Sequence, residues 1–187
     1  VGEFKGGVRV GQGLMTFPGG TKFIGTWQDD KPHGRGKLSS AGNYEYVGEF
    51  KNGVRHGQGT LETADGKKYE GRWENDVPHG EGKITYSDGA SYAGQFKNGK
   101  RHGEGEALFS DGSKYAGQWQ DDMRHGQGTI TYADDEQYIG EFVNDQKHGA
   151  GTQVMADGSK YSGRWQNDVL VRKEKISAPE AKEWFKQ

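Results

Sequence analysis

The sequence predicts an all-β protein, an elongated single-layer antiparallel sheet of stacked β-hairpins with a short C-terminal helix. One pattern recurs every 23 residues without insertions, so that a glycine falls at Gly2, Gly25, Gly48, Gly71, Gly94, Gly117, Gly140 and Gly163. Phe and Trp alternate two residues after each of these glycines, which adds a weaker period of 46 residues. Repeats that contact only their neighbours build an elongated array rather than a globule.

Each repeat is expected to form one hairpin. Tyr92, Gly94 and Phe96 are two residues apart, so on a strand they share one face. After a polar turn, residues 103–109 again alternate glycine or apolar residues with polar ones, which predicts a second strand. The strand glycines leave room for a Tyr, Phe or Trp ring to lie across the backbone. The Asp-Gly pairs that follow favour a turn into the next hairpin.

The segment YAGQFKNGKRHGEGEALFSDGSK, residues 92–114, resembles the MORN repeat. The resemblance covers about eight copies over residues 1–170, the predicted array, and leaves residues 171–187 as a tail. It implies an elongated antiparallel sheet with a grooved aromatic face. It also implies a role in cytoskeletal, ciliary or membrane-associated assemblies, or as the targeting region of a larger enzyme. Since the chain starts within a repeat, at Val1, further repeats are expected upstream.

The tail is expected to contain a helix over residues 178–186. Ser177 and Glu180 form a capping box, and Pro179 falls in the first turn. A helix of this length is marginal alone in water, so its rings must dock on something. The strand over residues 161–165 is expected to end the sheet with an unpaired edge. We therefore expect the C-terminal end to cap the array or to form a homodimer, through Val169, Leu170, Val171, Trp184 and Phe185.

Composition excludes several classes of protein. The chain has no cysteine, so it has neither disulfides nor thiolate sites. No apolar run is long enough to span a membrane. The net charge of −2, the pI near 6.3 and the lack of a basic stripe argue against binding to nucleic acid.

The histidines and carboxylates do not suggest an active site. All six histidines occupy one repeat position: His33, His56, His79, His102, His125 and His148. Equivalent residues of successive hairpins lie about 10 Å apart, too far to share a metal ion. Their rings are expected to pack at the hairpin corners with the nitrogens bonded to backbone. The adjacent carboxylates, as at Asp29-Asp30 and Asp121-Asp122, fall in turns, where they are expected to be solvated. We therefore expect no catalytic residue, cofactor or metal site, and no enzymatic activity.

The predicted function is a non-enzymatic scaffold in the cytoplasm, at cytoskeletal or membrane-associated structures. A long aromatic groove would suit a partner's helix or extended peptide. The predicted groove residues are Tyr46, Phe50, Tyr69, Trp73, Tyr92, Phe96, Tyr115, Trp119, Tyr138, Phe142, Tyr161 and Trp165. The alternative is a phosphoinositide-binding module that uses Lys97, Lys100 and Arg101. Because the charge of successive loops alternates in sign, this binding is expected to be weak.

Overall fold

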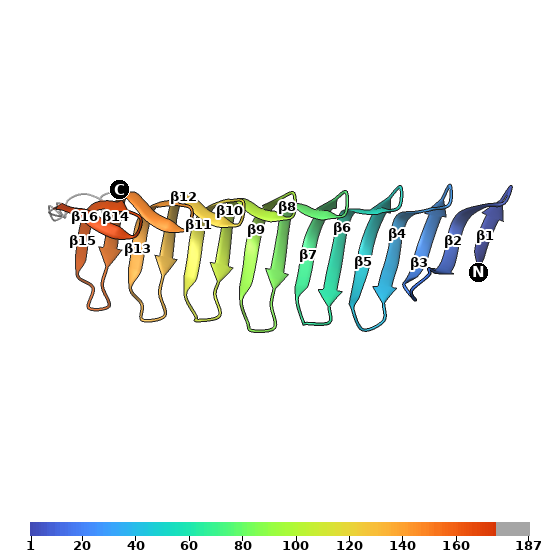
Figure 1. Cartoon of the computed structure of the whole chain (residues 1–187), viewed down its shortest axis with the longest axis horizontal. Coiled ribbons are helices and arrows are strands. Elements are labelled where there is room, and N and C mark those ends of the chain that lie inside the picture. The colour runs from blue at the N-terminus through green and yellow to red at the C-terminus, as the bar shows by residue number, and fades with distance from the viewer. Residues whose placement is uncertain (175–187) are drawn as a thin grey trace, which may run out of the picture.

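The computed structural model describes residues 1–174 as one sheet of sixteen strands. The strands follow one another in sequence order, each antiparallel to the next (Figure 1). They are β1 (Gly2–Lys5), β2 (Val8–Thr16), β3 (Lys22–Gln28), β4 (Lys31–Ser40), β5 (Tyr44–Lys51), β6 (Val54–Thr63), β7 (Lys68–Glu74), β8 (Val77–Thr85), β9 (Ser91–Lys97), β10 (Lys100–Leu108), β11 (Lys114–Gln120), β12 (Met123–Thr131), β13 (Gln137–Val143), β14 (Gln146–Val154), β15 (Lys160–Gln166) and β16 (Val169–Glu174). The all-β, single-layer architecture is confirmed. The helix predicted over residues 178–186 lies outside the described residues.

Two kinds of turn join the strands. Within a repeat, two residues with positive φ make the turn, as at Asn75 (φ 49°) and Asp76 (φ 69°) between β7 and β8. Positive φ at both positions gives the twist that antiparallel hairpins need. Between repeats the Asp-Gly turns form as predicted. There, Asp88 Oδ1 accepts a hydrogen bond from the backbone N of Ala90 (3.0 Å), and φ is 88° at Gly89.

A row of glycines crosses the sheet from strand to strand. Gly71, for example, is paired with Gly59 on one side and with Gly82 on the other. A Cβ at Gly82 would lie about 2.8 Å from Cε2 of Tyr69, because the tyrosine ring covers this stretch of backbone. Glycine is therefore required here by the close approach of a ring, as the sequence predicted.

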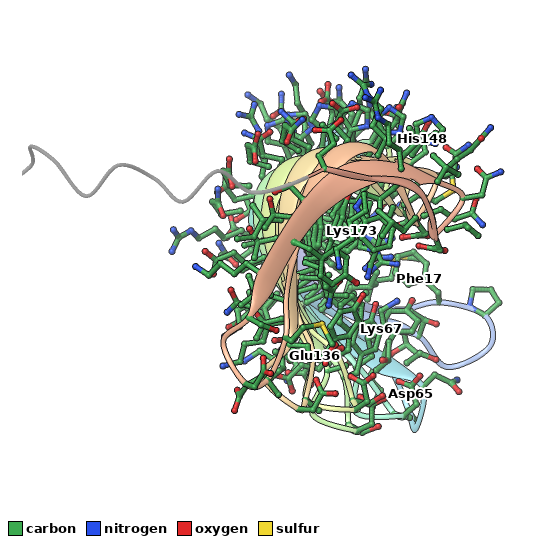
Figure 2. All side chains as sticks on the ribbon, turned by 90° about the vertical axis from the view of Figure 1, so that its left-hand side faces the viewer. Phe17, Asp65, Lys67, Glu136, His148 and Lys173 are labelled. Carbon is green, nitrogen blue, oxygen red and sulfur yellow. The ribbon has the colours of Figure 1, made fainter. Side chains whose placement is uncertain are left out.

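The core is a ladder of aromatic rings on one face of the sheet. Tyr69 meets Trp73 of its own strand edge to face at 5.1 Å, and Phe96 of the next hairpin at 5.2 Å. The same arrangement recurs from Phe23 to Trp165. Each such pair contributes about 0.5–1.5 kcal/mol beyond burial. Seen end-on, the strands arch around these rings, with Phe17 on the inner side (Figure 2).

The C-terminal strand differs from the prediction. Residues 161–165 were expected to leave an unpaired edge, but β16 pairs with β15 from Ser162 to Gln166. The sheet thus runs to Glu174, beyond the expected end of the array at residue 170. The reason is that strand pairing uses backbone groups. A positive-φ turn at Asn167 and Asp168 starts β16, although its side chains no longer follow the repeat.

Candidate interaction surfaces

The aromatic residues predicted to line a groove are core residues. All of the twelve except Tyr161 are buried, with 0–7% of their surface exposed. Each ring is occupied at its edge or face by neighbouring rings of the ladder, as for Tyr92 against Phe96 and Trp119. The prediction of an open groove between these rings is therefore wrong. The arch brings the rings together so closely that they fill the space that a peptide would need.

The tyrosine hydroxyls of the ladder are also satisfied internally. Tyr69 Oη donates to the carbonyl of Arg72 (2.9 Å), and Tyr138 Oη donates to that of Glu141 (3.1 Å). Burial raises the pKa of both Tyr69 and Tyr138 to about 12. These groups hold the hairpin together and stay protonated at neutral pH.

A second aromatic row is more accessible, and the sequence analysis did not assign it. Phe17, Phe109 and Tyr132 are half-buried against the ladder, and Tyr86 is 42% exposed. The Lys67 ammonium lies 5.7 Å from the centroid of the Tyr86 ring. The sequence contains a pattern that could have identified this row. Tyr86 continues the alternation at every second residue that starts at the strand glycines.

The opposite face of the sheet carries a hollow of about 700 Å³, which we call the outer hollow. It spans β2 to β7 and is lined by the paired glycines Gly25, Gly36, Gly48, Gly59 and Gly71. Ile24 and Val47 line it with 53% and 50% of their surface exposed. Exposed aliphatic side chains thus border a strip of bare backbone.

The outer hollow is basic around β3 and β4 and carries one acidic side chain, Glu70, at its β7 end. Arg35 lines it, and Lys22 precedes Ile24 on the same face of β3. Neither cation is in an ion pair within residues 1–174, whereas Lys37 is held by Glu45 at 2.7 Å. Farther along, a hollow of about 520 Å³ is lined by acidic residues and small ones: Glu81, Glu104, Glu106, Ala93 and Ala116. The outer face therefore changes charge along the array.

The basic group proposed for lipid contact is divided by the fold. Lys97 and Lys100 face each other across the hairpin of β9 and β10, and both are exposed. Arg101 is on the inner side, with Nε 3.2 Å from Asp122 Oδ1 and its guanidinium carbon 4.2 Å from the Trp119 ring centroid. Within residues 1–174, only two of the three cations are therefore presented to solvent without an acidic partner.

The histidines lie at the hairpin positions that the sequence predicted, but most of their Nδ1 atoms do not make the predicted bonds. Each lies in an irregular stretch of its strand. His79 of β8, for example, lies between Pro78 and Gly82, where the pairing with β7 shifts register between Gly71 and Trp73. Nδ1 is buried without a hydrogen-bond partner within the described chain in His33, His56, His102, His125 and His148. The expected bonds to backbone are therefore absent at Nδ1. One reason is that side chains take the free amides of this bulge, as when Gln127 N donates to Gln118 Oε1 (3.1 Å).

The described residues hold neither a metal-ligand cluster nor a helix able to cross a membrane. Among residues 1–174, His, Asp and Glu do not form a group of three that could hold a metal ion. Within the same stretch, no helix has the length and apolar character needed to cross a membrane.

The C-terminal edge of the sheet exposes apolar residues. Val169 and Val171 of β16 are 62% and 58% exposed, while Leu170 is half-buried against the core. Within the described chain, β16 pairs with β15 on one side only. Of the residues predicted for a cap or dimer contact, Trp184 and Phe185 lie outside the described residues.

Comparisons with solved structures find distant similarity. The SAS-4 TCP domain of Drosophila melanogaster, in complex with a proline-rich motif of Ana2, is 11% identical with a TM-score of 0.45. That match covers 82% of this chain and 90% of the other. The TCP10 domain of Danio rerio CPAP, in complex with a STIL peptide, is 16% identical over 81% of this chain and 77% of that one, with a TM-score of 0.28. These values are too low to support an inference about function, and no curated protein matches the chain.

The family comparison is decisive. The MORN repeat model matches seven successive segments, residues 1–22, 23–43, 46–68, 69–91, 92–114, 115–137 and 138–160. The eighth copy expected from the sequence lies beyond these segments, with its glycine and aromatic at Gly163 and Trp165 in β15. The matched segments cover most of the chain, so this protein belongs to the MORN repeat family.

Proposed function

We propose that the array is a non-enzymatic scaffold that binds an extended segment of a partner protein on its outer face. The observation that carries this proposal is the outer hollow, with exposed Ile24 and Val47 beside the glycine row. Following what the family resemblance implies, we place this scaffold in the cytoplasm at a cytoskeletal or membrane-associated assembly.

The width of the outer hollow favours an extended segment over a helix. Ile24 and Thr26 both line it, two residues apart on the outer face of β3. Two strand residues span about 7 Å. A helix with its side chains is about 10–12 Å across, which is wider than this spacing, so an extended segment fits between the two side chains better than a helix does. The hollow crosses five strand spacings, about 24 Å, which matches roughly seven extended residues.

The surroundings define the chemistry of the segment. Ile24 and Val47 favour aliphatic side chains, which alternate along one face of an extended chain. Arg35 and Lys22 are cations without an acidic partner in the described chain, so carboxylates on the segment would be attracted. We therefore propose a partner segment in which aliphatic and acidic residues alternate.

The test uses a labelled seven-residue peptide of alternating leucine and glutamate, with a leucine–lysine peptide as its counterpart. We expect the acidic peptide to bind, and Arg35→Glu to weaken it at least about tenfold, since opposite charges become like charges. Arg164→Glu is the control, because Arg164 is also exposed on the outer face but lies on β15, where its Nε is 4.0 Å from Glu174 Oε1. Equal binding of both peptides, or loss of binding in Tyr86→Ala instead, would overturn this site.

We further propose that the scaffold forms a homodimer through its C-terminal end. In the described chain β16 leaves one strand edge unpaired and exposes two valines, which invites pairing with another strand. Two-fold pairing of β16 with its copy would cover Val169 and Val171. Sedimentation equilibrium should give a dimer for the full chain and a monomer for Val171→Lys, whereas Val143→Lys on β13 should remain dimeric. A measured mass of 20.6 kDa, that of one chain, for the full chain at high micromolar concentration would refute the dimer.

An anionic membrane is the weaker candidate ligand. Binding to such a surface needs a cluster of about four to eight basic residues. Lys97 and Lys100 provide two, because Arg101 is engaged with Asp122. Vesicles containing phosphoinositide should therefore sediment little of the protein at about 0.15 M salt. Strong sedimentation that is lost when these three basic residues are changed to Ala would reverse the ranking of the two ligands.

A further inference from the structure

We infer that the sheet is divided into three cooperative blocks, β1–β4, β5–β8 and β9–β16, joined by two weaker junctions at which the array opens first. This goes beyond the proposed scaffold function, because it concerns how the scaffold bends and opens. It follows from side-chain contacts between successive hairpins, which differ from junction to junction.

An ion pair and a stacked guanidinium, together called the arginine latch, close the junction between β6 and β7. Arg55 Nε lies 3.0 Å from Asp76 Oδ1, and its Nη2 donates to the Asp76 carbonyl at 2.8 Å. Its guanidinium carbon lies 4.3 Å from the Trp73 ring centroid. Charge-assisted hydrogen bonds are about twice as strong as neutral ones, and the stacking adds a cation–π attraction.

The same latch closes other junctions. It recurs between Arg9 and Asp30 across β2 and β3 (2.7 Å), and between Arg101 and Asp122 across β10 and β11 (3.2 Å). At these junctions the tryptophan also donates its indole N–H to a glycine carbonyl of the preceding hairpin, for example from Trp119 to Gly105 at 3.1 Å. Phenylalanine has no such donor.

The junctions between β4 and β5 and between β8 and β9 lack the latch. Proline stands in place of the arginine at Pro32 and Pro78, and glycine stands in place of the aspartate at Gly53 and Gly99. The strand pairing of β8 with β9 remains, as does the backbone bond at the latch position, from Gly99 N to the Pro78 carbonyl at 2.8 Å. The junction ring is phenylalanine, so the indole bond is absent too. The ring ladder itself continues through both junctions.

The C-terminal block is uninterrupted because proline and glycine no longer alternate with arginine and aspartate at the latch positions there, although Phe and Trp still alternate. Arg124 forms the latch with Asp145 across β12 and β13 at 3.0 Å, although the junction ring is Phe142. Across β14 and β15, the Lys147 ammonium lies 4.9 Å from the Trp165 ring centroid, and its backbone N donates to Asp168 Oδ1 at 2.8 Å. The Pro-for-Arg and Gly-for-Asp replacements at the latch positions, and not the Phe/Trp period of 46 residues, therefore mark where the array is weak.

In a repeat array, stability is a sum of repeats and nearest-neighbour interfaces, and parts of the array open independently. Hydrogen bonds to charged groups stabilise a structure more than neutral ones do. A junction without them should open on the order of tenfold more often. The two weak junctions would let a long scaffold adapt its curvature without loss of the blocks.

The test is amide hydrogen exchange on the full chain, read at interior junctions so that fraying ends do not contribute. Amides that bond across β8 and β9 should exchange about tenfold faster than those across β6 and β7. Pro78→Arg with Gly99→Asp installs a latch, and should slow exchange at β8 and β9 to the level of β6 and β7. Gly99→Asp alone is the matched control and should not protect the junction.

The reverse change gives an independent test. Arg55→Pro with Asp76→Gly removes a natural latch, and should make the junction of β6 and β7 exchange as fast as that of β8 and β9. High salt should reduce the difference in exchange rate between the two junctions of the unchanged chain, since exposed ion pairs are screened. Equal exchange at both junctions in the unchanged chain would overturn the inference. So would an installed latch that leaves exchange at β8 and β9 unchanged in a folded protein.

Discussion

Replacing Trp119 by alanine should destabilise the array strongly. The ring is 3% exposed and meets Tyr92 and Tyr115 edge to face at 5.3 and 5.1 Å. Its N–H bonds the Gly105 carbonyl, and the Arg101 guanidinium stacks on it. Truncating a buried aromatic costs about 3–5 kcal/mol, and two aromatic pairs and a hydrogen bond are lost with it. Because these contributions overlap, we expect about 4–5 kcal/mol in total.

The assay is thermal unfolding followed by circular dichroism. For a chain of this size, 1 kcal/mol shifts Tm by about 2–4 °C, so Trp119→Ala should lower Tm by roughly 8–20 °C. Trp119→Phe is the matched control, since phenylalanine occupies this position in alternate repeats, as at Phe96. Phenylalanine keeps the ring contacts but loses the indole hydrogen bond, so Trp119→Phe should lower the free energy of unfolding by about 1–2 kcal/mol. An unchanged Tm for Trp119→Ala would refute the assignment of the rings to the core.

Three further outcomes are expected. Gly82→Val should cost stability comparable to a core truncation, because its side chain would enter the space of the Tyr69 ring, and a Tm equal to that of the parent would contradict this. Burial raises the pKa of Tyr69 and Tyr138 to about 12 from 10.0, so the stabilisation present below pH 10.0 should be lost as the pH rises through about 12. Tyrosinate absorbance reports this, and ionisation of every tyrosine near pH 10.0 would contradict it. Arg101→Ala should lower stability more than Lys97→Ala, since only Arg101 holds an aspartate and a ring; equal urea midpoints would contradict this.

The fold could be predicted because apolar residues and glycines recur at every second position of each repeat, which is the period of a β-strand. Residues such as Tyr69, Gly71 and Trp73 share a face, and the ring needs the bare backbone that glycine provides. The turns could be predicted for the same local reason, since Asp-Gly favours a particular backbone geometry. β16 was missed because its pairing depends on backbone groups and not on the repeated side chains.

The interaction surfaces could be predicted less well, because they depend on how far the sheet bends. Sequence alternation tells that Phe96 and Trp119 share a face, but not that the arch closes that face around its own rings. The arginine latch could not be predicted either, although the charges of successive loops alternate in sign, as neighbouring ion pairs would require. Arg55 and Asp76 are 21 residues apart, and their contact depends on the register between two hairpins.

The most direct test of the extended single-layer sheet is small-angle X-ray scattering, extrapolated to low concentration so that the mass of the monomer is verified. Sixteen strands give fifteen spacings of about 4.8 Å, or a rod of about 72 Å, whose radius of gyration is at least about 20 Å. A compact chain of 187 residues would give about 16 Å. The structure predicts a monomer value above 20 Å, and a value near 16 Å would contradict it.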